Sequence, residues 1–217
     1  MRLFSYWRSG TSYRVRIALA LKGIDADIVP VNLLEGEHTD EAHLARNPQG
    51  LVPTLELPDG TLISQSPAII EYLEEIRPDP PLLPANAAER ARARQFSALV
   101  ACDIHPLQNL RVLRYVQDML GHERDDAVAW ARHWITTGFE ALERQLADPT
   151  ADRPFALGAT PGITECHLVP QVYGARRYGV DLERFPRITT IARATEAWPG
   201  VRDAHPDNQV DAPKANP

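Results

Sequence analysis

A proline-rich segment near residue 80 divides this chain into two parts that must fold differently. Four of the seven residues from Pro78 to Pro84 are proline. Proline has no backbone N–H to donate, so neither a helix interior nor a central strand can run through this segment. We therefore predict a linker here, between one domain at residues 1–80 and a second at residues 81–205.

The part before the linker mixes strand and helix patterns. A helix with closely spaced apolar residues is predicted to end at Gly23, a residue type favoured just past a helix C-terminus. The turn Pro58-Asp59-Gly60 predicts a hairpin, and Ser66 followed by Pro67 predicts a helix capped by Ser66. The expected order β-α-β-α-β-β-α makes this an α/β domain. Its strands are expected at residues 3–7, 26–31, 54–57 and 61–63.

The part after the linker shows helical patterns and no convincing strand pattern. We therefore expect an all-α second domain. The tail at residues 206–217 is polar and contains prolines, so we expect it to be flexible. The helices are expected at residues 87–120, 124–147, about 162–178 and about 187–197.

Charge and cysteine content argue against several kinds of function. The formal net charge of −6 argues against a nucleic-acid partner, since such proteins present a basic surface. Cys102 and Cys166 form no CxxC pair, and no regular Cys/His ligand spacing occurs, so we expect no metal site. No apolar stretch reaches membrane-spanning length, and the first residues have a strand pattern rather than that of a signal peptide. We expect a cytoplasmic protein with reduced thiols and no membrane partner.

The turn Trp7-Arg8-Ser9-Gly10-Thr11-Ser12 is the first candidate for chemistry. It lies between the first strand and the first helix, where free backbone N–H groups and the helix dipole favour an anion such as a thiolate. Two interpretations remain open for its hydroxyls. One of them caps the helix, or one of them donates a hydrogen bond to a bound sulfur anion.

Two further segments suit a peptide-like ligand. A cis bond between Val52 and Pro53 would turn the backbone groups of Val52 outward, where an extended ligand could pair with them; a trans turn is the alternative. At Gln65-Ser66, a hydroxyl and the N–H groups of a helix start could hold a carboxylate, or Ser66 could simply cap the helix.

Five segments in order resemble the zeta class of glutathione transferases, over roughly residues 1–205. The resemblance implies a thioredoxin-like domain followed by a helical domain, with glutathione as cofactor and a homodimer as the assembly. The segments are Arg8-Ser9-Gly10-Thr11-Ser12 with the helix that follows, Asn47-Pro48 through Val52-Pro53-Thr54-Leu55, Gln65-Ser66-Pro67-Ala68-Ile69-Ile70, Ile104-His105-Pro106-Leu107-Gln108-Asn109 and Leu168-Val169-Pro170-Gln171-Val172.

The signature turn departs from the family's commonest pattern, Ser-Ser-Cys-Ser. Here the four positions are Ser9, Gly10, Thr11 and Ser12. The first serine, the family's usual thiolate partner, is present, but the cysteine is absent. Chemistry that needs a protein thiol at this position is therefore excluded. Either Ser9 or Thr11 could be the main partner of the sulfur.

The resemblance implies roles for residues in both domains. His105 and Asn109 are four residues apart, so on one helix they would share a face. For the residues assigned to the substrate, the alternatives are that His105 is an ordinary half-buried histidine and that the arginines are solvated surface charges. Arginine suits a dicarboxylate because its planar fork can bind both oxygens of a carboxylate. The implied glutathione ligands are Ser9, His38, Gln49, Val52, Gln65, Ser66 and, from the partner chain, Asp103. The implied substrate ligands are Arg8, His105, Asn109, Arg111 and Arg176, and the implied catalytic residues are Ser9, Thr11 and Arg8.

The function implied by the resemblance is cis–trans isomerisation of a maleyl keto-acid, maleylacetoacetate or maleylpyruvate, to its fumaryl isomer during the breakdown of aromatic compounds. A glutathione transferase that conjugates or dehalogenates small electrophilic acids is one alternative. A non-catalytic interaction module with the same fold is another, although such a module would not need Ser9, Gln49, Gln65 and Ser66.

Overall fold

The computed structural model describes residues 1–147 and 153–213. The chain forms two compact units, one made of Met1–Leu82 with Ala197–Pro217, the other of Leu83–Glu196. The first boundary lies within the predicted proline-rich linker. The difference from the predicted division is at the other end, because residues 197–205 belong to the first unit.

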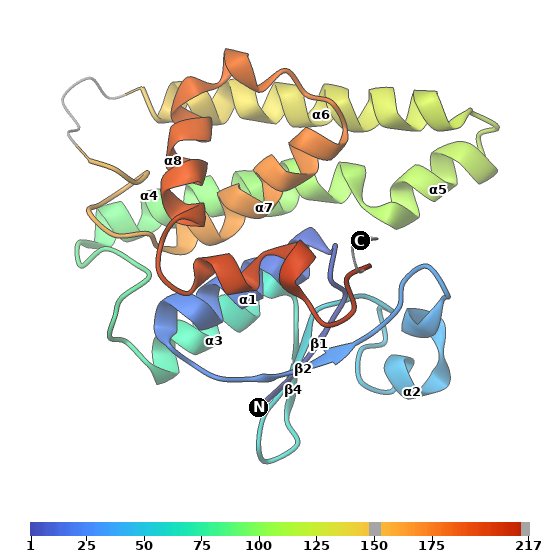
Figure 1. The fold of residues 1–217 in the computed structure, drawn as a ribbon, viewed down its shortest axis with the longest axis horizontal. Coiled ribbons are helices and arrows are strands. Elements are labelled where there is room, and N and C mark those ends of the chain that lie inside the picture. The colour runs from blue at the N-terminus through green and yellow to red at the C-terminus, as the bar shows by residue number, and fades with distance from the viewer. Residues whose placement is uncertain (148–152, 214–217) are drawn as a thin grey trace. The chain divides into compact units, whose positions relative to one another are not determined.

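The first unit contains a four-stranded mixed sheet (Figure 1). The strand order is β2-β1-β3-β4, with β1 parallel to β2 and β3 antiparallel to both β1 and β4. The predicted hairpin is therefore confirmed. The strands are β1 (Arg2–Ser5), β2 (Asp27–Pro30), β3 (Thr54–Glu56) and β4 (Leu62–Ser64).

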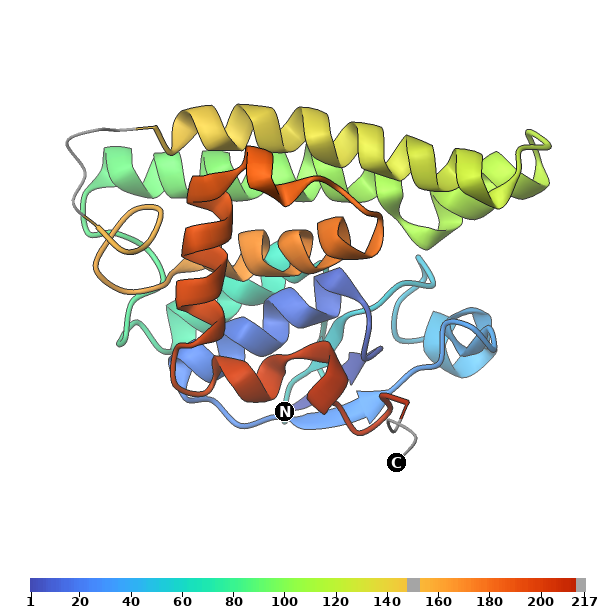
Figure 2. The same cartoon turned by 45° about the horizontal axis from the view of Figure 1, so that its top comes forward.

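Three α-helices complete the order expected for this unit. They are α1 (Gly10–Lys22), α2 (Glu41–Leu44) and α3 (Ser66–Ile76), and a 3-10 turn at Glu37–Thr39 precedes α2. Helices α1 and α3 lie side by side (Figure 2). Helix α1 ends at Gly23 with φ 58°, as predicted for a residue without a Cβ. The prediction that Ser66 caps α3 is wrong, because Ser66 is the first helical residue and Gln65 occupies the cap position.

A buried lysine joins the end of α1 to α3 and the linker. The side chain of Lys22 is fully buried, and its ammonium forms an ion pair with Glu74. It also donates to the carbonyls of Arg77 and Pro80, both at 2.7 Å. An ammonium has three N–H donors, so these three partners satisfy it completely. Burial of a charge is costly unless it is paired in this way.

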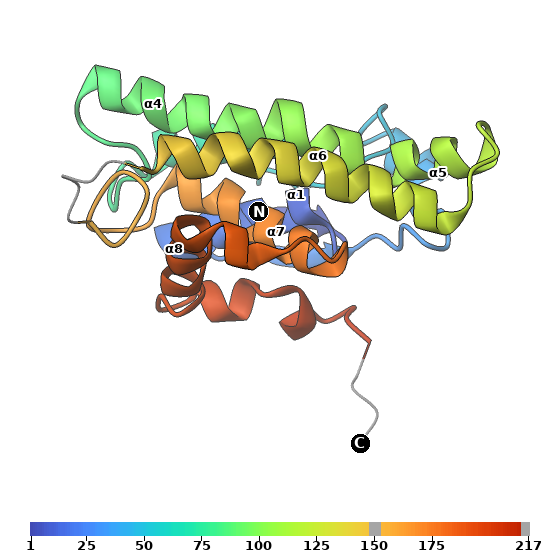
Figure 3. The same cartoon turned by 90° about the horizontal axis from the view of Figure 1, so that it is seen from above.

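The second unit consists of helices in the part of the chain that the structure describes. Figure 3 shows α6 running along α4 and the segment that follows α4. The helices are α4 (Ala87–Ala98), α5 (Leu110–Asp118), α6 (Arg124–Gln145), α7 (Ile163–Arg177) and α8 (Pro186–Glu196).

The helix expected over residues 87–120 is interrupted. After α4 the chain forms a π-helical segment at Leu99–Ile104 and a 3-10 turn at His105–Gln108, and Asn109 is extended before α5 begins. Pro106 has no N–H for an α-helical hydrogen bond, which accounts for a break at this point. A Cβ at Gly138 of α6 would overlap the side chain of Ile104, so the missing side chain lets α6 approach the π-helical segment closely.

The segment after α8 returns to the first unit and contacts α1 through the 3-10 turn Val201–Ala204. A second 3-10 turn, Pro206–Asn208, follows, and Gln209 Nε2 donates to the carbonyls of Asp203 and His205 at 2.9 and 3.0 Å. Within the tail that was expected to be flexible, residues 206–208 thus form a 3-10 turn and Gln209 makes local hydrogen bonds. Residues 214–217 of that expected tail lie outside the described residues. Among the described helices, none has the length and apolar character needed to cross a membrane.

Candidate functional site

Ser9 caps helix α1. Its backbone is extended, with φ −68° and ψ 120°, and its Oγ accepts a hydrogen bond from the N–H of Ser12 at 3.2 Å. The N–H of Ser9 donates to the carbonyl of Tyr6 at 3.0 Å, which closes the turn between β1 and α1. The capping interpretation is confirmed, and it places the Ser9 hydroxyl at the positive end of the helix dipole.

A chain of hydrogen bonds joins Ser9 to Thr11 and Val52. The two hydroxyl oxygens lie 2.9 Å apart, and the Thr11 hydroxyl donates to the carbonyl of Val52 at 2.9 Å. A hydroxyl has one proton, and a carbonyl can only accept. Thr11 therefore gives its proton to Val52 and accepts from Ser9. Of the two hydroxyls, that of Ser9 is the one that can turn to a new acceptor without breaking the bond to Val52.

The segment around Val52 is held in place by the loop before it. The Val52–Pro53 peptide bond is cis, the first of the two alternatives that the sequence left open. Asn47 braces this loop, because its side chain donates to the carbonyl of Leu51 at 2.8 Å and accepts from the N–H of Gln49 at 3.1 Å. Val52 thus lies between β3 and a fixed loop.

Gln49 and Gln65, two predicted glutathione ligands, are in direct contact. The Gln65 amide donates to the Gln49 amide oxygen at 2.6 Å. Gln65 has φ 70°, a left-handed conformation that costs a residue with a side chain on the order of 1–3 kcal/mol. The backbone of His38 lies close to Gly50, the residue after Gln49, since a Cβ at Gly50 would be 3.1 Å from the His38 carbonyl oxygen.

Ser66 lies at the start of α3 beside a buried arginine that the sequence analysis missed. Ser66 is buried, and its hydroxyl accepts from Arg14 Nη1 at 3.3 Å. Arg14 is 2 % exposed, although its place in an ordinary helical pattern gave no sign of this. A positive charge, a hydroxyl and the N–H groups of a helix start together suit a carboxylate.

Apart from Arg8, the remaining predicted residues belong to the second unit. The prediction that His105 and Asn109 share a helix face is wrong, because His105 begins a 3-10 turn and Asn109 is extended. The Asn109 side chain instead caps α5 by accepting from the N–H of Arg111 at 3.1 Å. Arg111 and Asp103 are exposed.

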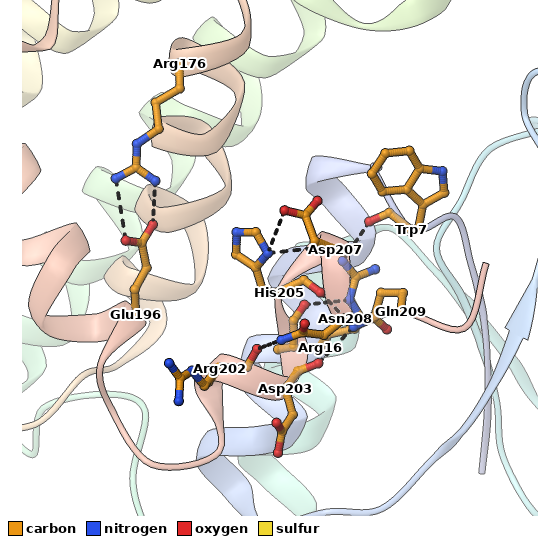
Figure 4. A network of polar contacts seen from close by, with 11 residues as sticks. Trp7, Arg16, Arg176, Glu196, Arg202, Asp203, His205, Asp207, Asn208 and Gln209 are labelled. Carbon is orange, nitrogen blue, oxygen red and sulfur yellow. Dashed lines mark hydrogen bonds and ion pairs between the residues drawn. The ribbon is translucent and has the colours of Figure 1, made fainter. Parts of the chain in front are cut away.

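Arg176 and Arg8 each have a partner within their own unit. Arg176 forms a two-pronged ion pair with Glu196, with N···O distances of 2.8 and 3.5 Å (Figure 4). Arg8 belongs to the first unit, where its Cζ lies 5.3 Å from the centroid of the Trp7 ring, within range of a cation–π contact.

Comparison with known proteins identifies the family. The model for "Glutathione S-transferase, N-terminal domain" matches residues 8–76. A maleylacetoacetate isomerase from Pseudomonas aeruginosa is 48% identical over 99% of this chain and 100% of its own length. The solved holo structure of a maleyl pyruvate isomerase, described as a bacterial zeta-class glutathione transferase, is 44% identical, with a TM-score of 0.95 over 98% of this chain and 100% of that one. This chain belongs to the zeta class of glutathione transferases.

A second solved structure shows what one relative of this zeta-class chain binds. It is a maleylacetoacetate isomerase from Anaeromyxobacter dehalogenans, 42% identical, with a TM-score of 0.87 over 98% of this chain and 97% of that one. That protein was crystallised with dicarboxyethyl glutathione and citrate in its active site. The predicted two-domain fold, with its thioredoxin-like first domain, is confirmed by these comparisons.

If the α3 start holds a glutathione carboxylate, Gln65→Ala and Ser66→Ala should each weaken glutathione binding. The loss of one hydrogen bond to a charged group should reduce affinity by about 10- to 100-fold, measured by isothermal titration calorimetry. Thr61→Ala, in the exposed hairpin turn before β4, is the matched control and should bind normally. Wild-type affinity in both site variants would place the carboxylate elsewhere.

Proposed function

We propose that this chain is a glutathione-dependent cis–trans isomerase that converts a maleyl keto-acid to its fumaryl isomer in the breakdown of aromatic compounds. The observation that carries the proposal is the Ser9 hydroxyl at the start of α1, which can donate to an anion while Thr11 stays bonded to Val52. The names of the three isomerases described above, and the glutathione adduct bound by one of them, support the same reaction.

The residues of the first unit fit glutathione. The helix start with Ser9 suits its sulfur, and Val52 suits its peptide backbone. Ser66 with Gln65 suits the carboxylate of its γ-glutamyl end, and His38 or Gln49 contacts its glycyl end. When bound, glutathione supplies a thiolate that adds reversibly to the conjugated alkene, which allows the former double bond to rotate before the sulfur leaves.

Ser9 keeps that sulfur anionic. Its hydroxyl donates to the sulfur, and the N–H groups and dipole of α1 add positive potential, all of which favour the charged form. The Ser12 N–H donates to the same Ser9 oxygen at 3.2 Å, which polarises the hydroxyl towards donation.

Arginines hold the carboxylates of the substrate. We assign Arg8, Arg111 and Arg176 to this role, with Arg8 also stabilising the negative charge that develops on the carbonyl oxygen. Arg176 is already paired with Glu196, so a substrate carboxylate would compete with the Glu196 carboxylate for its N–H donors. His105 and Asn109 complete the proposed set of substrate ligands.

The proposal also covers the oligomeric state of the protein and its location in the cell. The family resemblance implies a homodimer, in which the exposed Asp103 would face the ammonium group of the glutathione bound by the partner. The strand pattern of the first residues and the cysteine content favour a cytoplasmic location. Conjugation or dehalogenation of small electrophilic acids remains the competing activity, since it uses the same thiolate and differs only in how the adduct decays.

Purified protein should isomerise maleylacetoacetate or maleylpyruvate only when glutathione is present, as followed by ultraviolet absorbance. Glutathione should be regenerated, so a catalytic amount should suffice for complete conversion. Stoichiometric consumption of glutathione would indicate conjugation instead. No turnover of either substrate would favour the non-catalytic module.

Ser9→Ala should raise the pKa of the bound glutathione thiol and lower kcat at neutral pH. A lost hydrogen bond to an anion is worth about 1.5–3 kcal/mol, or about one to two pKa units, seen by titrating thiolate absorbance. The deficit should shrink at high pH, where the thiolate forms without help. Thr11→Val should have the smaller effect, because the Thr11 hydroxyl donates to the carbonyl of Val52. An equal or larger effect would make Thr11 the hydrogen-bond partner of the sulfur.

Arg8→Ala, Arg111→Ala and Arg176→Ala should each raise KM for the dicarboxylate by about 10- to 100-fold and leave glutathione affinity unchanged. Glu196→Gln should lower KM, because it releases Arg176 from its ion pair. Arg184→Ala removes an exposed arginine that pairs with Glu140 at 2.7 Å, and it should behave as wild type. Normal KM in all three site variants would remove these arginines from the substrate site.

A further inference from the structure

The C-terminal segment of the described chain reaches the turn that carries Ser9. The Asp211 carboxylate accepts a hydrogen bond from the backbone N–H of Trp7 at 2.9 Å. The two residues are 204 positions apart in the sequence. Trp7 lies only two positions before Ser9, so this bond acts on the turn between β1 and α1 rather than on the body of either element.

Arg16 holds the same turn from the side of α1. Its guanidinium donates to the carbonyl of Trp7 at 2.9 Å and to the Ser5 hydroxyl at 3.1 Å. Its Nε donates to the carbonyl of Ala204 at 3.0 Å, which ties the C-terminal segment to the same side chain. Figure 4 shows Arg16 between Trp7 and the residues of this segment.

Both backbone polar groups of Trp7 are therefore bonded, its N–H to Asp211 and its carbonyl to Arg16. Together with the bond from the Ser9 N–H to the Tyr6 carbonyl, these contacts fix the peptide planes that lead into Ser9. A donor that acts on a bound anion is effective only when it is held in the productive geometry.

We propose that Asp211 is a positioning residue, which uses the C-terminal segment to hold the turn so that the Ser9 hydroxyl meets the glutathione sulfur. The inference rests on the proposed role of Ser9. Asp211 does not touch the sulfur in this proposal; it acts through the backbone of Trp7.

The charge of Asp211 and its hydrogen bond should affect the thiol in opposite directions. A carboxylate near the helix start disfavours a second anion and so raises the pKa of the thiol. Correct placement of Ser9 lowers that pKa. Asparagine keeps an oxygen that can accept from Trp7 but removes the charge, whereas alanine removes both, so the two variants separate the effects.

The experiment compares Asp211→Ala, Asp211→Asn and Asp207→Ala, a control that removes another carboxylate of the same segment. The side chain of Asp207 is 68% exposed and lies 3.6 Å from His205 Nδ1, while the carboxylate that accepts from Trp7 is that of Asp211. We expect Asp211→Ala to raise the pKa of the bound glutathione thiol and to lower kcat at neutral pH about 3- to 10-fold, with an unchanged KM for the dicarboxylate. Asp211→Asn should give a thiol pKa no higher, and a kcat no lower, than those of the wild type. Asp207→Ala should match the wild type in both values.

Three results would overturn the inference: an unchanged thiol pKa in Asp211→Ala, a lowered one, or an asparagine variant as defective as the alanine variant. The titration follows thiolate absorbance in the glutathione complex, so it does not depend on isomerase activity. If Ser9→Ala raises the thiol pKa and Asp211→Ala does not, only this inference fails. If neither raises it, the proposed role of Ser9 fails as well.

Discussion

The buried guanidinium of Arg16 constrains the start of the first unit. Arg16 is 4 % exposed, and an arginine cannot lose its proton to escape the cost of burial, so its N–H groups must find acceptors in the chain. Those acceptors include the carbonyls of Trp7 and Ala204, which belong to opposite ends of the chain. One side chain thus joins the segment after α8 to the turn before α1, which leads into Ser9.

In the proposed function, a single helix start serves structure and chemistry together. Ser9 accepts from the Ser12 N–H to cap α1, which uses a lone pair of its oxygen and leaves its proton for another acceptor. Thr11 stands where the family usually has a cysteine, and its hydroxyl donates its proton to the carbonyl of Val52. The substitution therefore does more than remove a thiol: it supplies a link between the helix start and the Val52 loop.

Local signals in the sequence predicted much of this arrangement. Gly23, the Pro58-Asp59-Gly60 turn and the proline-rich linker each impose a backbone constraint that few neighbours can override, and each was located correctly. The sequence also placed Ser9 at a strand-to-helix turn and raised a cis Val52–Pro53 bond as one of two alternatives, and the structure has both features. One helix was expected over residues 87–120 because π and 3-10 turns share the apolar spacing of an α-helix over short stretches. Pro106, a residue that can kink a helix, was the one local sign of the interruption.

Long-range partners could not be predicted in the same way. Arg14 and Arg16 stand in a helix, where arginine ordinarily faces solvent, and nothing nearby in the sequence reveals the acceptors that bury them. Asp211 lies in a polar, proline-bearing stretch whose composition is typical of flexible tails, and its partner Trp7 is at the other end of the chain. The unusual backbone of Gln65 was missed because glutamine is not a residue type typical of left-handed positions.

The Lys22 amine is shielded from chemical modification in the folded protein. The chain contains two lysines, Lys22 and Lys214, against a much larger number of arginines. The Lys22 ammonium is fully buried and has all three of its protons donated, so an acylating reagent cannot reach its nitrogen in the folded state. Acylation of Lys22 therefore requires α1, α3 and the linker to separate. This amine is a built-in reporter of the opening of the first unit, readable by mass spectrometry without any engineered label.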